Sequence, residues 1–350
     1  MKARIAGLFP YILVVIAAGI FSRLAFTMPF FADDFTFIDA LKTRSIREAS
    51  FYFYDQFNGR LFSHFFLCTV FRVFGGHAEY LFLYRMLLLS VFMLALCFLL
   101  KNYFFTVYGK TIALRQSGFL SATFTAFFFL FFLEGSYETW FWVSATGVHL
   151  VSIIAGMAGF AVLFSRQKIR PKAIFASLLF LLAGGFSETN ALMYFVLLFI
   201  LLIRQKAEKR IPVFFALAAI AGGLLVNLLS GGIQTRLGWL PGFDWLQAVK
   251  NSFHAMAMPF IRWHFLPVKL ALIAGLLFYS RAEYGWKFSE LKKLLRQAAL
   301  VLAFIFTCFF ITALILSDVT PDRAASTGYL AGTLFLFDIF IFRELKISAQ

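Results

Sequence analysis

The stretch "IAGLFPYILVVIAAGIFSRL" at residues 5–24 is an apolar run long enough to cross a bilayer, and "MPFFADDFTF" at residues 28–37 follows it directly. A transmembrane helix needs about 20 apolar residues to span ~30 Å of hydrocarbon. The run ends in large side chains such as Phe21, whereas a signal-peptide cleavage site needs small ones, so we expect a retained helix. Two adjacent carboxylates, Asp33 and Asp34, therefore lie just beyond the first predicted crossing.

The composition indicates a polytopic helical membrane protein. Hydrophobic residues make up 61% of the 350-residue chain, charged residues only 14%, and the mean hydropathy is +0.84. Repeated apolar runs with this composition exclude a soluble globular core. The three cysteines, Cys68, Cys97 and Cys308, lie inside apolar runs without a CxxC pair, so they indicate neither a disulfide framework nor a zinc site.

Eleven apolar segments divide the chain. They fall at residues 5–24, 61–75, 79–100, 118–133, 147–165, 174–186, 190–203, 211–229, 266–280, 298–316 and 329–342. The segment 61–75 is short, carries His64 and Arg72, and is rich in aromatic residues, so we predict that it lies in the membrane interface. About ten crossings remain, in one integral membrane domain over residues 1–350. Residues 25–78 form an outer loop with interfacial helices, and no soluble domain is indicated.

The distribution of charge predicts the orientation. Lys and Arg prefer the cytoplasmic ends of short loops, and ten crossings place every strongly basic loop, together with both termini, on the cytoplasmic side. The net charge of +15 and the pI of 9.9 are then a topological signature. Nucleic-acid binding is an unnecessary explanation for them.

The sequence "GGFSETN" separates the short apolar runs 174–186 and 190–203. One continuous helix would hold Glu188 at membrane depth, at a cost of about 2.5–3.5 kcal/mol on insertion scales. We therefore predict a hairpin with Glu188 at its outer turn. Because both runs are short for spanning, a recessed turn that lines a cavity is consistent with them.

The acid pair is the first candidate for chemistry. Asp33 or Asp34 is suited to act as a general base, or the two to hold a divalent cation such as Mg²⁺ or Mn²⁺. The alternative is a helix cap, because Asp is a favoured capping residue and residues 35–57 form an amphipathic stretch. A cap needs only one of the two acids, and the second adds like-charge repulsion.

Further polar residues gather on the predicted outer side. Asn58 and Arg60 flank a glycine in "NGR", where the alternative is a simple turn. Glu138 and Trp142 belong to "YETWFWVSATGVH", which also suits an aromatic belt with solvated acids.

Three charged residues complete the candidate substrate-binding set. Glu188 lies in "SETNA", where a polar turn is the alternative. Arg236 and Arg323 have guanidinium groups that match phosphate geometry, although contact with lipid headgroups explains them about as well. His149 alone is more typical of an ordinary interfacial residue.

The order of the motifs "ADDF", "NGR", "WVSATG", "SETNA" and "SGGIQTR" resembles the GT-C superfamily of membrane glycosyltransferases and an allied family of bacterial multipass proteins. The resemblance covers nearly the whole chain through short, degenerate motifs. It implies transfer of a sugar from a polyprenyl-phosphate donor to a glycan or lipid acceptor on the outer face of a bacterial plasma membrane. An acid of the first outer loop, here Asp33 or Asp34, would serve as base or metal ligand. His149 and the "SGG" sequence depart from the pattern.

Two other classes of function remain open. A lipid or glycan transporter would suit broken helices and polar residues within the membrane, but no pair of similar halves is present, and the charges cluster on one side. A noncatalytic subunit of a polysaccharide assembly system would tolerate replacement of the acids.

Overall fold

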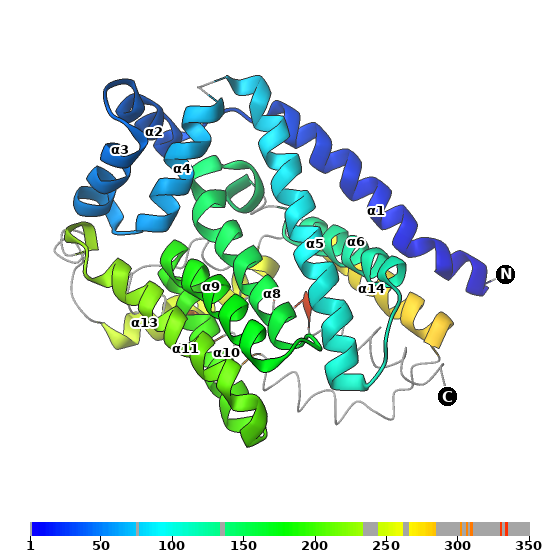
Figure 1. Cartoon of the computed structure of the whole chain (residues 1–350). Helices are drawn as coiled ribbons and strands as arrows, with labels where there is room; N and C mark the ends of the chain where they lie inside the picture. Colours follow the sequence, from blue (N-terminus) through cyan, green and yellow to red (C-terminus); the bar gives the residue numbers. More distant parts are fainter. Residues whose placement is uncertain are drawn as a thin grey trace. The chain divides into compact units, whose positions relative to one another are not determined.

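The computed structural model describes residues 2–74, 77–133, 137–233, 244–261 and 266–284, with seven single residues between Leu302 and Leu334. All regular elements among these residues are helices, which confirms the predicted all-helical class (Figure 1). The α-helices are α1 (Lys2–Thr27), α2 (Ala32–Thr43), α3 (Ile46–Phe53), α4 (Leu61–Phe74), α5 (Leu81–Tyr108), α6 (Leu114–Phe131), α7 (Val143–Ala145), α8 (Val151–Leu163), α9 (Ile169–Phe186), α10 (Glu188–Arg204), α11 (Ala207–Leu228), α13 (Trp245–Ile261) and α14 (Leu266–Tyr284). The π-helical turns are η1 (Tyr54–Asn58), η4 (Tyr137–Phe141) and η5 (Thr146–Leu150), and η2 (Ala78–Tyr80) is a 3₁₀ turn.

Among the described residues, five helical stretches are long and apolar enough to cross a membrane. They are Leu8–Thr27, Leu81–Tyr108, Val143–Leu163, Ile169–Phe186 and Arg210–Leu228, and each coincides with a segment predicted from the sequence. The stretches Leu61–Phe74 and Leu266–Tyr279 are apolar but shorter. The segments 298–316 and 329–342 lie outside the fully described ranges. The helices therefore suit a membrane protein, and the number of ten crossings stays a prediction.

The contacts divide the chain into two compact units that are discontinuous in sequence. The first unit comprises residues 1–23, 119–136 and 243–350. Within it, α1 packs on α6 through Phe21 and Phe129, whose ring centroids are 5.4 Å apart. Phe9 of α1 also contacts Tyr279 of α14, at 6.4 Å between centroids. The prediction of one integral membrane domain is left open by this division.

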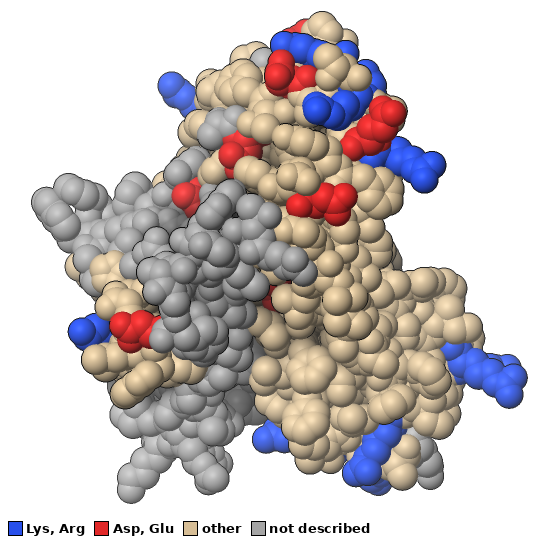
Figure 2. Space-filling view, turned by 90° about the vertical axis from the view of Figure 1, so that its left-hand side faces the viewer, with Lys and Arg blue, Asp and Glu red and all other residues tan. Residues whose placement is uncertain are grey.

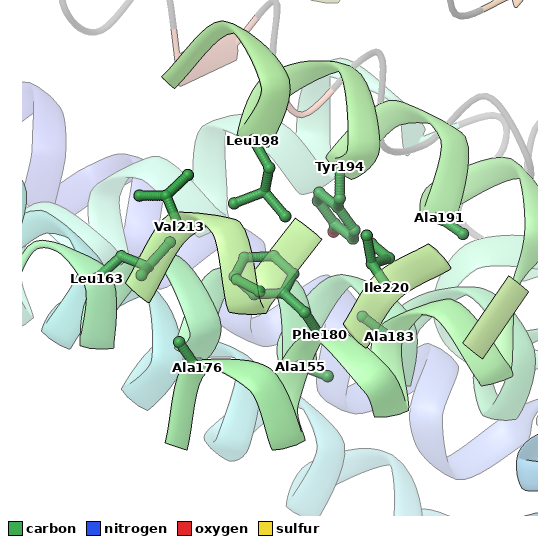
Figure 3. Packing of buried hydrophobic residues seen from close by; sticks show 11 residues of the cluster. Ala155, Leu163, Ala176, Phe180, Ala183, Ala191, Tyr194, Leu198, Val213 and Ile220 are labelled. Carbon is green, nitrogen blue, oxygen red and sulfur yellow. The ribbon is translucent and has the colours of Figure 1, made fainter. Parts of the chain in front are cut away.

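The second unit comprises residues 24–118 and 137–242, and its core lies among α8, α9, α10 and α11. Figure 3 shows Phe180 of α9 at the centre of this core, with Tyr194 and Leu198 of α10 beside it. The rings of Phe180 and Tyr194 meet edge to face at 6.1 Å between centroids. Because residues 14 positions apart touch across α9 and α10, the chain reverses between them, as the predicted hairpin requires.

Two glycines allow α9 and α11 to approach closely. A Cβ at Gly223 would lie 2.5 Å from the Leu181 carbonyl oxygen and 2.8 Å from the Gly185 nitrogen. A Cβ at Gly184 would lie 2.7 Å from the Ile220 carbonyl oxygen. Small residues at such a contact bring backbones together in membrane helix packing, where lipid removes most of the hydrophobic driving force.

The predicted amphipathic stretch 35–57 is two helices and a π-helical turn. Helix α2 ends at Thr43, and the next residue, Arg44, has an extended backbone. Ser45 then caps α3 by accepting from the Glu48 nitrogen. The Glu48 carboxylate accepts the Ser45 N–H in return at 2.8 Å. This reciprocal capping box stabilises the start of α3. Helix α4 then packs against α9 and η5, so it is partly enclosed by protein.

Candidate functional site

The structure gives different environments to the two adjacent acids. Asp34 is 0% exposed, and its Oδ2 accepts the Phe31 N–H at 3.0 Å, which caps the start of α2. Its Oδ1 accepts the Ser144 N–H at 2.9 Å and also the Ser144 hydroxyl. Asp33 is partly exposed and forms no hydrogen bond or ion pair with the described residues. Asp34 therefore anchors the turn, while the Asp33 carboxylate is partly open to solvent.

The electrostatics of Asp34 follow from these contacts. Burial raises the pKa of the Asp34 carboxyl, and the hydrogen bonds from Ser144 and Phe31 and the positive charge of Arg85 act in the opposite direction. Both carboxylate oxygens already accept hydrogen bonds, so they are poorly placed to coordinate a cation. No cluster of three or more His, Cys, Asp or Glu suited to a metal occurs in the described part of the chain. The donor set suits a proton acceptor at Asp33 better than a two-carboxylate Mg²⁺ or Mn²⁺ site.

Arg85 of α5 bonds two separate stretches of backbone near Asp34, residues 25–29 and Phe141. The sequence did not predict this role. The Arg85 guanidinium donates to the Phe141 carbonyl from Nε and Nη2, at 3.1 and 2.7 Å. It also donates to the carbonyls of Ala25, Met28 and Pro29, at 2.8, 2.7 and 3.3 Å. The side chain is 1% exposed. A lone arginine inside an apolar run was the available signal, because such residues are costly in membranes and are usually functional or structural.

A buried ion pair forms the second part of the site. Arg60 Nε lies 2.7 Å from Glu188 Oε2, and both side chains are largely buried. Glu188 Oε1 and Asn58 Oδ1 are buried and have no hydrogen-bond partner among the described residues. Unpartnered buried acceptors are rare and indicate a missing donor. The predicted residues Arg60 and Glu188 thus lie together, and Asn58 precedes Arg60 by two positions in the same turn. Substrate binding by the three residues stays a prediction.

The "NGR" turn also lies against the "SGG" sequence. Gly59 has φ of 71°, and a Cβ there would overlap Ser230 Oγ, so glycine is required on both counts. A Cβ at Gly232 would lie 2.6 Å from the Tyr54 carbonyl oxygen. The Tyr54 hydroxyl donates to the Val226 carbonyl at 2.7 Å. Two motifs that begin 172 residues apart in sequence are therefore neighbours at the end of α11.

The segment 143–150 connects the acid pair with the break between α9 and α10. Ser144 bonds Asp34 near one end of the segment, and Thr146 Oγ1 lies 3.0 Å from the Tyr84 hydroxyl. Near the other end, His149 Nδ1 lies 3.3 Å from Ser187 Oγ. The Asn190 amide donates to the His149 carbonyl at 3.1 Å. His149 is buried in the protein, and its place at the membrane interface stays a prediction.

The break at Ser187 lies inside the protein. Ser187 has an extended backbone and caps α10 through the Asn190 nitrogen, while Glu188 is only 8% exposed. The turn is therefore enclosed by protein, and its depth in the membrane stays a prediction. Ser144 and Ser187 were not predicted as site residues, because an isolated serine carries no distinctive sequence signal.

The remaining predicted residues are only partly placed. Glu138 lies in η4 and Trp142 precedes α7, and both are partly exposed beside the segment that Arg85 holds. Arg236 and Arg323 lie outside the described residues.

The three π-helical turns independently mark this region. They are rare in proteins and frequent at functional sites. Here η1 leads into "NGR", and η4 and η5 flank the short helix α7 that bonds Asp34. No protein-family model, curated protein or solved structure matches the chain. Membership of the GT-C superfamily stays a prediction that rests on the motifs.

Proposed function

We propose that the chain is a membrane glycosyltransferase of the GT-C type. It would transfer a sugar from a polyprenyl-phosphate donor to a lipid-linked or surface glycan on the extracytoplasmic face of a bacterial plasma membrane. The observation that carries this proposal is that the two adjacent acids have different environments. Asp34 is buried and fully hydrogen-bonded, which leaves the partly exposed Asp33 as a proton acceptor at the start of α2.

In the proposed reaction, the Asp33 carboxylate takes the proton of an acceptor hydroxyl. The hydroxyl oxygen attacks the anomeric carbon, and the bond from that carbon to the lipid phosphate oxygen breaks with inversion. The electron pair leaves with the lipid phosphate, and Asp33 releases its proton to solvent. A cation near the departing phosphate stabilises the developing charge.

Arg60 is the described residue best suited to that cationic role. Its Nε is bound to Glu188, while its terminal guanidinium nitrogens make no hydrogen bond to described residues. Glu188 holds the group in place, so it is preorganised for a phosphate oxygen. Arg236 and Arg323 remain the other candidates for this role.

The arrangement of charge in the second unit supports the proposed orientation. Gly184, near the end of α9, adjoins Ile220 and Asn227 near the end of α11, at the side of "NGR" and Glu188. The opposite ends of the two helices begin in the basic turns "RQKIRPK" and "RQKAEKR". Basic loops prefer the cytoplasmic side. The Asp33 and Glu188 side would then be extracytoplasmic, with both chain termini in the cytoplasm after ten crossings.

Comparison of Asp33→Asn with Asp39→Asn tests the proposal. Asp39 is an exposed acid on the same helix that pairs with Lys42, so it is a matched control. Cells that lack the gene are complemented with each variant, and their lipid-linked and surface glycans are analysed by mass spectrometry. We expect Asp39→Asn to restore one sugar mass and Asp33→Asn to restore none at equal membrane levels. Full restoration by Asp33→Asn would remove the basis of the proposal, and displacement of an unaltered glycan would favour a transporter.

A further inference from the structure

A buried histidine of α4 has no hydrogen-bond partner in the described part of the chain. His64 is 0% exposed, and neither ring nitrogen, Nδ1 or Nε2, has a donor or acceptor within reach among those residues. Its ring lies against Phe37 of α2 and Phe53 of α3, at 5.8 and 5.6 Å between centroids. Buried polar atoms without a partner are rare and indicate a missing group, such as an ion.

Cys68 lies one helical turn beyond His64 on the same face of α4. Residues four apart on a helix have Cβ atoms about 5–6 Å apart. Cys68 is 0% exposed and free of a disulfide, and its thiol hydrogen-bonds with the Ser50 hydroxyl of α3. Ser50 and Phe53 lie one turn apart on α3, which packs on α4. The thiol and the imidazole therefore both face the contact between α3 and α4.

The surroundings of these two side chains are apolar. Figure 2 shows acidic and basic side chains on the outer surface at the top of the view, over α2 and α3, where Asp39 and Lys42 form an exposed pair. Inside, aromatic rings cover His64. A buried water needs about two to four polar partners, and the Ser50 hydroxyl already donates to the Ile46 carbonyl at 2.6 Å. Few polar groups are therefore left to hold a water beside the imidazole.

The charge of the site selects the kind of ion. Burial lowers the pKa of His64 to about 3, so the imidazole is neutral, and the positive charge of Arg60 acts in the same direction. A thiolate with a monovalent cation is neutral overall. A divalent cation would instead leave a net positive charge in an apolar site near Arg60, which is costly.

The ligand types select the same ion. Thiolate is a soft ligand that favours Cu(I), and imidazole also binds copper. Cu(I) is stable with two ligands in a line, whereas structural Zn²⁺ takes four. The described residues form no cluster of three or more His, Cys, Asp or Glu that would suit zinc.

We propose that His64 and Cys68 form a two-coordinate site for a soft monovalent cation of the Cu(I) type. On binding, the S–H bond of Cys68 breaks, the bond from sulfur to the metal forms, and the proton leaves to solvent. One imidazole nitrogen gives its lone pair to the metal, and the other keeps its hydrogen. No electron is transferred, so the step needs no oxidant or reductant. The site stands apart from the glycosyltransferase function, because neither residue acts in the proposed reaction.

Copper retention by a single-thiol form of the full chain provides the test. Cys97→Ser with Cys308→Ser leaves Cys68 as the only thiol. This parent protein is purified in detergent and equilibrated without oxygen with Cu(I) and a chromophoric Cu(I) chelator, and the bound copper is measured. We expect one Cu(I) per chain, and no retention of Zn²⁺ at the same concentration. X-ray absorption at the copper edge should show one sulfur and one imidazole nitrogen, which tests the ligand set without any further substitution.

His64→Phe keeps an aromatic ring but removes the nitrogen ligand. It should weaken Cu(I) affinity at least about tenfold, since changes even in the partners of metal ligands cost ~10–100-fold. His77→Phe is the matched control, because His77 is exposed and pairs with Glu79, and it should leave the affinity unchanged. Cys68→Ser should abolish binding, and the melting midpoint without copper checks that each variant is folded.

Three results would overturn the proposal. An unchanged affinity in His64→Phe, or a copper spectrum without an imidazole nitrogen, would reduce the site to a lone thiol. Absence of Cu(I) from the parent protein would remove the site altogether. Retention of Zn²⁺ as strong as that of Cu(I) would refute the preference for a soft monovalent ion.

Discussion

Replacement of Asp34 by Asn should destabilise the protein, whereas replacement of Asp33 should not. An asparagine has one acceptor oxygen, while the Asp34 carboxylate uses two, one toward Phe31 and one toward Ser144. If the amide oxygen stays with Ser144, its NH₂ group faces the Phe31 N–H, and that backbone donor loses its acceptor.

The expected cost comes from two effects. A buried donor left without a partner costs about 1–3 kcal/mol, and the bonds from Ser144 lose roughly half their strength once the acceptor is neutral. Loss of a buried charge offsets part of this, since burial raises the pKa of Asp34. We therefore expect a net loss of about 2–4 kcal/mol for Asp34→Asn. Asp33→Asn should change stability by less than ~0.5 kcal/mol, as surface substitutions usually do.

Thermal unfolding in one detergent at a fixed scan rate measures the difference, because membrane proteins often unfold irreversibly. At about 2 °C per kcal/mol, Asp34→Asn should lower the midpoint by roughly 4–8 °C and Asp33→Asn by less than ~1 °C. Per folded molecule, Asp33→Asn should lose more transfer activity than Asp34→Asn. An unchanged midpoint for Asp34→Asn, or an equal fall for Asp33→Asn, would refute the assignment of Asp34 as the structural acid.

The other predictions concern packing, the buried arginine and pH. Gly223→Ala should cost about 1–3 kcal/mol in thermal stability, because the new Cβ meets the Leu181 carbonyl, whereas a Cβ at Gly222 lies 3.8 Å from its nearest neighbour and Gly222→Ala should be tolerated. Arg85→Lys supplies at most three donors where the guanidinium makes five hydrogen bonds, so the melting midpoint should fall, and Arg85→Leu should lower it further. Burial lowers the pKa of His64 to about 3, so the unfolded chain binds more protons between about pH 6.5 and 3, and stability falls as pH falls through that window. His64→Phe should therefore flatten the decline of the melting midpoint between pH 6.5 and 5, and an identical decline in both proteins would contradict this.

The sequence predicted the long helices well, because length and hydropathy decide them. The runs 79–100 and 211–229 correspond to Leu81–Tyr108 and Arg210–Leu228. The break before Glu188 was also predictable, since an acid at membrane depth is costly. The packing of α4 was not, because lipid is as apolar as a protein core and the pattern cannot tell the two apart. His64 consequently lies buried against the rings of Phe37 and Phe53, in a segment expected at the interface.

Site residues were likewise predictable only where the signal is local in the sequence. The acids and "NGR" are polar residues in an apolar chain, so composition alone is enough to identify them as candidate site residues. The distinction between Asp33 and Asp34 depends on Ser144, 110 residues away, which no local pattern reveals. Arg85 was equally hidden, because its carbonyl partners come from two separate segments.

The segment 143–150 meets a physical requirement of the proposed chemistry. Transfer needs the proton acceptor and the leaving phosphate to be held at a fixed separation, since small misplacements cost large factors in rate. Asp34, which positions Asp33, and Ser187, which precedes Glu188, are both bonded to this one segment. The segment is a short helix joined to a π-helical turn, and its Thr146 contacts Tyr84 of α5. Its irregular backbone therefore links the two halves of the site, and its geometry determines the distance between the proposed base and the proposed phosphate-binding arginine.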